Sequence, residues 1–325
     1  MDRYQKTIRL CACLLLWAVL YRLGTTGFFN PLITLLTGRQ AMEVIWFLET
    51  GRRFPVTEPS LPTQPTGNTA PTQPTEVSLP EDSTPAVFFD AGLVQINSYC
   101  GYEPQVEAWL EQPLTWELRQ EAPTVLILHS HATECYENAP YRTEDPTRNM
   151  ISVGDYLVQR LEQAGIHALH DRTLHDAPSY TAAYGNARAS LQHYLQTYPE
   201  IRLVLDLHRD ACEDAEGNQL PQTVPGTDTA RLMLVVGSDA GGLSHSRWPE
   251  NMALAVKLHA ALEQMLPGIC RPISFRTQRF NQDLSTGALL VEIGAAGNTH
   301  HQALEGAKVL ADAIIALAEG SDGKK

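Results

Sequence analysis

Basic side chains are scarce in this 325-residue sequence, which has 24 Lys and Arg against 37 Asp and Glu and a net charge of −13. Nucleic-acid binding needs clustered Lys and Arg to neutralise phosphates, so this balance argues against that function. Six cysteines are too few, at this length, for a domain held together by disulfides. The glycine-rich phosphate loops G-x-x-x-x-G-K and G-x-G-x-x-G do not occur, which disfavours a nucleotide-dependent enzyme.

The N-terminal residues 1–54 have the pattern of a membrane anchor. Three basic residues precede the apolar run 10–20, which places the N-terminus in the cytoplasm. The run is short for a span of ~20 residues and has the length of the apolar core of a secretory signal. Because no A-x-A-like cleavage site follows, and Tyr21 and Arg22 suit a membrane interface, we expect a retained anchor. A cleaved signal is the alternative; both place the rest of the chain outside the cytoplasm.

A spacer follows at residues 55–85. It contains eight prolines and many Thr and Ser, with few large apolar side chains, so it cannot bury enough surface to fold. Hydrophobic residues make up 43% of the whole chain. Most of the chain outside the anchor and the spacer can therefore form a packed core. We expect the folded domain at 86–325.

Within that domain, apolar runs alternate with amphipathic segments. Strands are predicted at 124–128, 166–169, 201–207, 231–237, 272–276 and 288–293, and helices at 148–165, 180–198, 250–266 and 299–318. The last helix opens with a capping box, Thr299 to Gln302. Buried strands alternating with helices predict an α/β domain with a mainly parallel or mixed sheet, whose chemistry lies at the carboxyl ends of its strands.

Histidines and acids stand at the ends of three predicted strands. His131 and Glu134 follow the first, His208 follows 201–207, and Glu292 lies within the last. Two imidazoles and one carboxylate suit a zinc ion whose fourth position holds water. Glu292 would then act as the base that accepts a proton from that water.

Each of these residues also has a plainer interpretation. His129, at a strand end, is most simply a hydrogen-bonded core or rim histidine. His131, Glu134 and His208 would otherwise form a surface ion-pair cluster. An acid in an apolar strand is costly to bury without a partner, which favours a functional Glu292. The remaining histidines, including His170 and the pair His300 and His301, lack ligand spacing and are expected to have no role in a site.

Three ordered motifs, VLILHSHATECY, DLHRDA and FNQDLSTGALLVEIGAAGNT, resemble the stage II sporulation protein P family of endospore-forming bacteria. The resemblance covers roughly residues 86–318 and extends to the anchor and linker. It implies a zinc-dependent N-acetylmuramoyl-L-alanine amidase, with endopeptidase activity on stem-peptide crosslinks also attributed to the family. The implied fold is a phosphorylase/hydrolase-like α/β sandwich with helices on both faces of a mixed sheet.

Carried over by position, the resemblance implies that His131, Glu134 and His208 bind Zn²⁺ and that Glu292 is the general base. It leaves His129, Arg209 and Asp210 as residues that orient a ligand or contact substrate. Cys135 follows Glu134 where we expect Ser in the family.

The resemblance also implies a setting. Peptidoglycan glycan strands and stem peptides would be the substrate, in the intermembrane space of the sporangium. Stage II sporulation protein D, a lytic transglycosylase, and stage II sporulation protein M, a multispanning membrane protein, would be the partners.

Two other functions remain open. A zinc carboxypeptidase or other metallopeptidase would use the same residues, with an arginine that grips the terminal carboxylate, for which Arg209, Arg148 and Arg188 are candidates. A non-catalytic, membrane-tethered module that binds the cell wall would be expected to lack one of the four site residues, and none is missing.

The four cysteines of the exported part leave one further question. Cys135 and Cys212 each lie four residues after a predicted ligand, and an extracytoplasmic location permits a disulfide between them. The alternatives are two buried, unpaired thiols, or a thiol that competes as a zinc ligand.

Overall fold

The computed structural model describes residues 86–114, 116–137 and 141–322. The predicted anchor, 1–54, and linker, 55–85, lie outside these residues. No helix within the described ranges combines the length and the apolar character that a membrane span needs.

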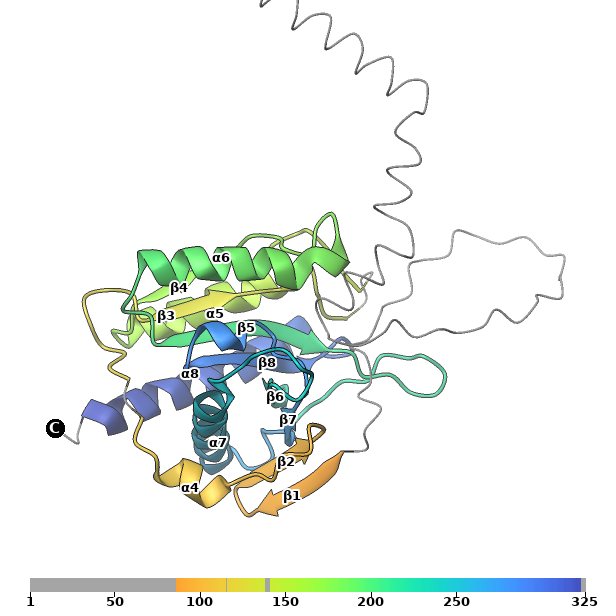
Figure 1. Ribbon diagram of the computed structural model, residues 1–325. Helices are drawn as coiled ribbons and strands as arrows, with labels where there is room; N and C mark the ends of the chain where they lie inside the picture. The colour runs from red at the N-terminus through yellow and green to blue at the C-terminus, as the bar shows by residue number, and fades with distance from the viewer. Residues whose placement is uncertain (1–85, 115, 138–140, 323–325) are drawn as a thin grey trace, which may run out of the picture. The chain divides into compact units, whose positions relative to one another are not determined.

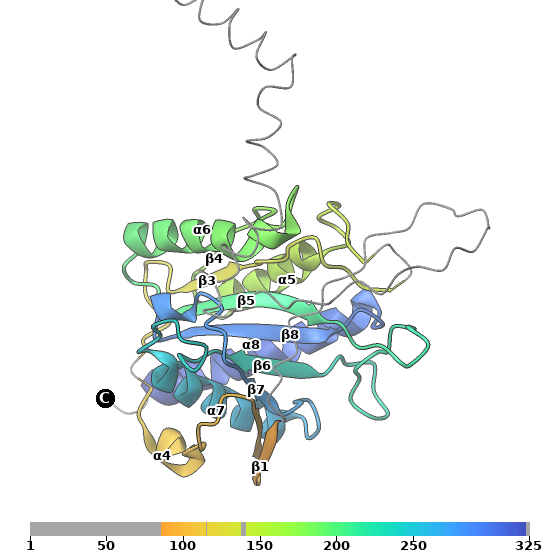
Figure 2. The ribbon, with the colours of Figure 1, turned by 45° about the vertical axis from the view of Figure 1, so that its right-hand side comes forward.

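One mixed sheet organises the described residues, with strand order β1-β2-β7-β6-β8-β5-β3-β4, from bottom to top in Figures 1 and 2. Its strands are β1 (Val87–Ala91), β2 (Val94–Ser98), β3 (Val125–Leu128), β4 (Ala168–His170), β5 (Leu203–Asp210), β6 (Leu232–Val236), β7 (Ile273–Phe275) and β8 (Ala288–Ala295). Neighbours pair in parallel, except for β1 with β2 and β6 with β8, which are antiparallel. The expected mixed sheet is therefore confirmed.

Helices cover both faces of the sheet, as expected. They are α4 (Val106–Glu111), α5 (Met150–Gln163), α6 (Ala183–Thr197), α7 (Trp248–Met265) and α8 (His300–Asp322), with short 3₁₀ turns at Tyr180–Ala182 and Gln282–Leu284. Side chains of α5, α7 and α8 share one large core with Ile127 and Leu205. On the other face, α6 packs through Ala187 and Leu191 against Leu126. Neighbouring residues of one strand, such as Leu126 and Ile127, thus point to opposite faces of the sheet, and both faces are buried.

The predicted strands and helices are present, with shifted boundaries, and three elements were not predicted. β1, β2 and α4 lie at the far edge of the sheet. The apolar run of β1, VFFDA, ends at Phe89 because Asp90 follows, so this strand gives a weaker signal than the buried ones. The capping box is confirmed, because Gln302 N–H donates to Thr299 Oγ1 and Thr299 N–H donates to Gln302 Oε1, both at 3.1 Å.

The largest correction concerns β5, which was expected to end at residue 207. It continues to Asp210, so His208 and Asp210 lie inside the strand rather than beyond it. The reason is its neighbour β8, which pairs His208 with Glu292 and Asp210 with Ala295. Between these pairs β8 has one extra residue, and Gly294 there adopts a φ of 67°, which glycine tolerates best. A β-bulge thus lies directly beside Glu292, as bulges often do near functional residues.

Candidate active site

The residues predicted as metal ligands come together at the carboxyl ends of β3 and β5. His131 and Glu134 lie in the turn after β3, and His208 lies in β5. His208 Nδ1 is 3.3 Å from Glu134 Oε2, and the rings of His131 and His208 are 5.4 Å apart. The three residues are 5%, 5% and 3% exposed, so a surface ion-pair cluster is excluded.

Asp206, which the sequence analysis missed, fixes the orientation of His208. Its Oδ1 is 3.0 Å from His208 Nε2, so Nδ1 is directed towards Glu134. Ser130 holds this carboxylate with its backbone N–H at 2.7 Å and its hydroxyl at 2.5 Å. Asp206 and His208 are two residues apart in β5 and therefore share a face. That spacing was the one signal for Asp206 in the sequence.

His208, Asp206 and Glu134 shift the pKa values of one another. Burial lowers the pKa of His208, but the charges of Asp206 and Glu134 outweigh burial and raise it well above its usual value. For Glu134 burial raises the pKa, while His208 and Arg209 lower it more strongly, to about 2. The two carboxylates that face its ring nitrogens thus favour the protonated form of His208 in the metal-free protein.

His131 is held by aromatic contacts more than by hydrogen bonds. Its ring stacks on Tyr180 at 4.1 Å between centroids, and the Arg142 guanidinium lies 3.5 Å above the same tyrosine. Its Nδ1 lies 3.8 Å from Asp176 Oδ2 and has no hydrogen-bond partner among the described residues. Thr133 holds Asp176 through its backbone N–H and hydroxyl.

Glu292 lies beside His208 on the neighbouring strand. It is 5% exposed, and its Oε2 is buried without a hydrogen-bond partner in the described part of the chain. Burial and the charge of Asp210 raise the pKa of Glu292 to about 8. A carboxyl group so placed exchanges protons near neutral pH, as a general acid or base must.

His129 packs against Gly154 of α5. Its Nδ1 donates to the carbonyl of Leu207 at 3.0 Å, and its Nε2 is 2.8 Å from Nε2 of His170, whose Nδ1 meets Asp155. His129 is 0% exposed, so contact with a substrate is not supported. Its hydrogen bond to Leu207 fixes the backbone next to His208. His170 thus forms part of a buried hydrogen-bonded chain, which gives it no role in the site.

Arg209 and Asp210 hold loops and strands in place. The Arg209 side chain donates to the carbonyls of Cys135 and Tyr141, and its backbone N–H donates to Glu134 Oε2 at 3.2 Å. Asp210 forms an ion pair with Arg271 and accepts a hydrogen bond from the Cys212 thiol. Cys135 and Cys212 are present as thiols, not as a disulfide.

Tyr184, at the start of α6, is a second residue that the sequence analysis missed. Its ring is parallel to that of His208, at 6.4 Å and 12°, and perpendicular to that of His131, at 5.4 Å. Burial, together with the charges of Asp206, Glu292 and Glu134, raises its pKa well above 10. An aromatic residue in an amphipathic helix gives no signal of such a position.

The chemical nature of these side chains fits zinc, although they do not stand ready as ligands. In the described residues no three His, Cys, Asp or Glu side chains are grouped closely enough to hold a metal ion as they stand. The donor set is nevertheless the two imidazoles and one carboxylate that zinc prefers. His131 Nδ1 and Glu292 Oε2 have no hydrogen-bond partner among the described residues. Asp206 also orients His208 in the way that a carboxylate behind a zinc-binding histidine does.

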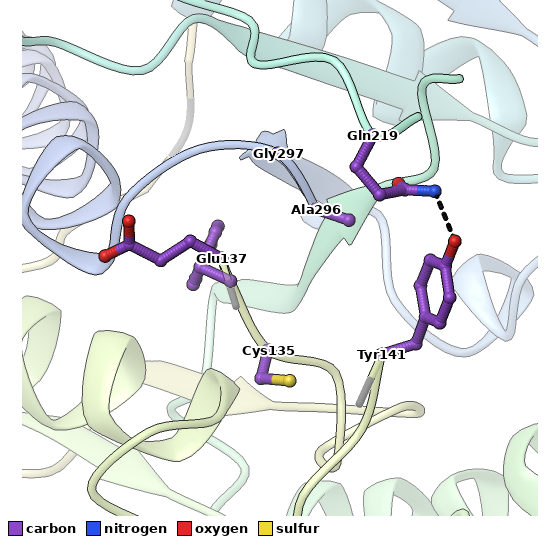
Figure 3. A pocket seen from close by; sticks show the side chains of 7 residues that line it. Cys135, Glu137, Tyr141, Gln219, Ala296 and Gly297 are labelled. Carbon is purple, nitrogen blue, oxygen red and sulfur yellow. Dashed lines mark hydrogen bonds between the residues drawn. The ribbon is translucent and has the colours of Figure 1, made fainter. Parts of the chain in front are cut away.

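A pocket of about 330 Å³ opens at the same edge of the sheet (Figure 3). The loop after β3 lines it with Cys135, Tyr136, Glu137 and Tyr141, the loop after β5 with Gln219, and the loop after β8 with Ala296 and Gly297. Gln219 Nε2 donates to the Tyr141 hydroxyl at 2.8 Å across its rim. Cys135 in its lining directly follows Glu134 in the sequence. The pocket is therefore formed by the loops that follow the three strands of the candidate site.

Fold and site together define an α/β protein whose mixed sheet gathers histidines and carboxylates at the carboxyl edge of its central strands. The family model described as Stage II sporulation protein P (SpoIIP) matches residues 63–315, and the chain belongs to this family. Stage II sporulation protein P of Bacillus subtilis (strain 168) is 28% identical over 207 residues, which cover 58% of this chain. The match spans 49% of that relative, about half its length.

Solved structures of amidases are more distant. The N-acetylmuramoyl-L-alanine amidase AmiC2 of Nostoc punctiforme is 16% identical with a TM-score of 0.37, over 62% of this chain and 98% of that one. The CwlD amidase from Clostridioides difficile, in complex with the GerS lipoprotein, is 10% identical with a TM-score of 0.42, over 62% and 100%.

Proposed function

We propose that this protein is a zinc-dependent peptidoglycan hydrolase that cleaves the amide between N-acetylmuramic acid and L-alanine during sporulation. The observation that carries the proposal is the meeting of His131, Glu134, His208 and Glu292 at one sheet edge, from three separate strands. Family membership supports the sporulation setting and the substrate class. Cleavage of stem-peptide crosslinks belongs to the same proposal as a second activity.

Each residue has a defined role in this proposal. His131, Glu134 and His208 would hold zinc, which supplies a Lewis acid that polarises the amide carbonyl and makes bound water acidic. Asp206 holds the His208 ring so that Nδ1 faces Glu134, the other proposed ligand. Glu292 accepts a proton from water and returns it to the nitrogen of the leaving amine.

The pocket beside Glu134 would accept the substrate chain next to the scissile amide. Residues 1–54 would anchor the protein, 55–85 would be the tether, and 86–325 would be the catalytic domain in the intermembrane space. A lytic transglycosylase, stage II sporulation protein D, and stage II sporulation protein M remain the proposed partners.

A carboxypeptidase is the less favoured alternative. Arg188 binds Asp283 with two hydrogen bonds, and Arg209 is used on loop carbonyls, so neither is placed to grip a terminal carboxylate. Of the three candidate arginines, Arg148 is therefore left as the one that could bind a terminal carboxylate. A cell-wall-binding module without catalysis remains a further alternative, and the partnerless Glu292 oxygen argues against it.

The test is digestion of purified murein by the full-length chain, with mass spectrometry of the products. Free stem peptides that begin with L-alanine, together with peptide-free glycan strands, are the expected result. Release of single C-terminal amino acids would indicate a carboxypeptidase, and binding without any product would indicate a module. Glu292→Gln is the matched inactive control, because it keeps the shape of the side chain and removes the base.

A further inference from the structure

The segment Phe280–Asp283, the FNQD part of the third sequence motif, has no role in the function proposed above. It lies between β7 and β8, and its side chains connect the start of α6 to the end of β6. Gln282 makes the β6 connection, accepting from Gly237 N–H at 2.8 Å and donating to the carbonyl of Val235 at 2.9 Å. Gln282 is 2% exposed, so both bonds are buried.

The other three residues of the segment hold α6. Asn281 Nδ2 donates to the backbone carbonyl of Tyr184 at 2.9 Å, and the ring of Phe280 lies 5.9 Å from the Tyr184 ring. Asp283 binds Arg188, one helical turn further along, with hydrogen bonds of 2.8 and 2.7 Å. The first turn of α6 is therefore fixed at both its backbone and its side chains.

The backbone of the segment is unusual in a way that serves these contacts. Phe280 and Asn281 both have positive φ, 47° and 58°, a conformation that residues other than glycine rarely adopt and that is least expected for a bulky one. Two such residues in succession reverse the chain here, and the reversal delivers the Phe280 ring and the Asn281 amide to Tyr184. Strained backbone of this kind concentrates at functional sites.

Tyr184 in turn faces the candidate active site. Its ring is 5.4 Å from that of His131 and 6.4 Å from that of His208. Its backbone carbonyl accepts from Asn281, whereas its hydroxyl makes no hydrogen bond to any described residue and is available to a substrate. A phenol keeps its proton at neutral pH and therefore acts as a donor.

We propose that Tyr184 is a further catalytic residue, whose hydroxyl donates a hydrogen bond to the carbonyl oxygen of the scissile amide, and that Asn281 positions it. This inference rests on the proposed amidase function. As Glu292 takes a proton from water, the water oxygen bonds to the carbonyl carbon and the π pair moves to the carbonyl oxygen, where negative charge develops. The pair then returns, the C–N bond breaks, and the nitrogen receives the proton from Glu292. Tyr184 stabilises the charged oxygen throughout and gives up no proton.

The first test is Tyr184→Phe in the full-length chain, assayed on a soluble muramoyl-peptide. Loss of one donor to a developing oxyanion lowers kcat by about 10²–10³-fold. We expect that drop with KM within about twofold and with zinc content unchanged. Tyr194→Phe, the same one-atom change further along α6, is the matched control and keeps full activity. Unchanged kcat, a change in KM alone, or loss of zinc from Tyr184→Phe would each overturn the role.

The second test is Asn281→Gly, which removes the amide but keeps a residue that tolerates positive φ. We expect about a tenfold lower kcat in the wild-type background and no further drop in the Tyr184→Phe background, because Asn281 acts through that hydroxyl. Equal drops in both backgrounds would overturn the positioning role. If the wild-type chain cleaves no muramoyl amide, the proposed function fails; if it does and Tyr184→Phe equals it, only this inference fails.

Discussion

Replacement of Glu292 by Gln should change how the stability of the metal-free protein depends on pH. Burial and Asp210 raise the pKa of this carboxyl from 4.5 to about 8 in the folded state. The folded protein therefore keeps a proton that the unfolded chain releases above about pH 4.5. Its contribution to stability is fully present below that pH and is lost as the pH rises through 8. At 1.36 kcal/mol per pH unit, the interval from 4.5 to about 8 corresponds to up to about 5 kcal/mol.

The assay is urea unfolding in the presence of a chelator between pH 5 and 9, comparing wild type with Glu292→Gln. Because Gln carries no proton to lose, the variant should gain stability relative to wild type as the pH rises, by several kcal/mol at pH 9. Glu121→Gln, a change at an exposed carboxylate, should run parallel to wild type. Parallel curves for Glu292→Gln as well would refute the reasoning that this group is buried and protonated.

Three further changes test the surroundings of the site. Gly154→Ala should lower the free energy of unfolding, measured with urea, by about 1–3 kcal/mol, because the added Cβ would lie 2.5 and 2.8 Å from two buried imidazoles. The control Gly185→Ala adds a Cβ in open space and should raise the free energy of unfolding by up to about 1 kcal/mol. Asp206→Asn should weaken zinc binding about 10–100-fold in competition with a chromophoric chelator, and an unchanged affinity would exclude its orienting role. His131→Ala combined with His208→Ala should abolish zinc binding by elemental analysis, and stoichiometric zinc in that variant would exclude both residues as ligands.

Much of the central sheet could be predicted because its strands are buried on both faces. Runs such as 124–128 and 288–293 are apolar at all but one position, a character typical of parallel or central strands. Within such a run Glu292 is conspicuous, because an acid there must be compensated by function or by a partner. The edge hairpin of β1 and β2 gave no such signal, since its side chains are partly exposed and its pairing with β7 joins segments far apart in the chain.

The residues that support the site were harder to find because they act through tertiary contacts. Asp206 lies inside a strand predicted as purely structural, and its partner Ser130 is 76 residues away in sequence. Tyr184 was assigned to a helix, and nothing in helical periodicity tells which turn meets His131. β5 extends to Asp210 because it pairs there with β8. No local sequence pattern specifies this pairing beyond His208.

The two histidines of the H-x-H motif show most clearly where periodicity fails. Strict alternation places residues 125, 127, 129 and 131 on one face of the sheet, so His129 and His131 would point together. The strand ends at Leu128, however, and His129 keeps the direction of Ile127, towards α5. A turn closed by Glu134 N–H donating to His131 O then redirects the chain, and His131 reaches the opposite face beside Tyr180. The turn therefore separates His129, which contacts His170 of β4, from His131, which faces His208. His131 and Glu134 are for this reason the pair to test as metal ligands.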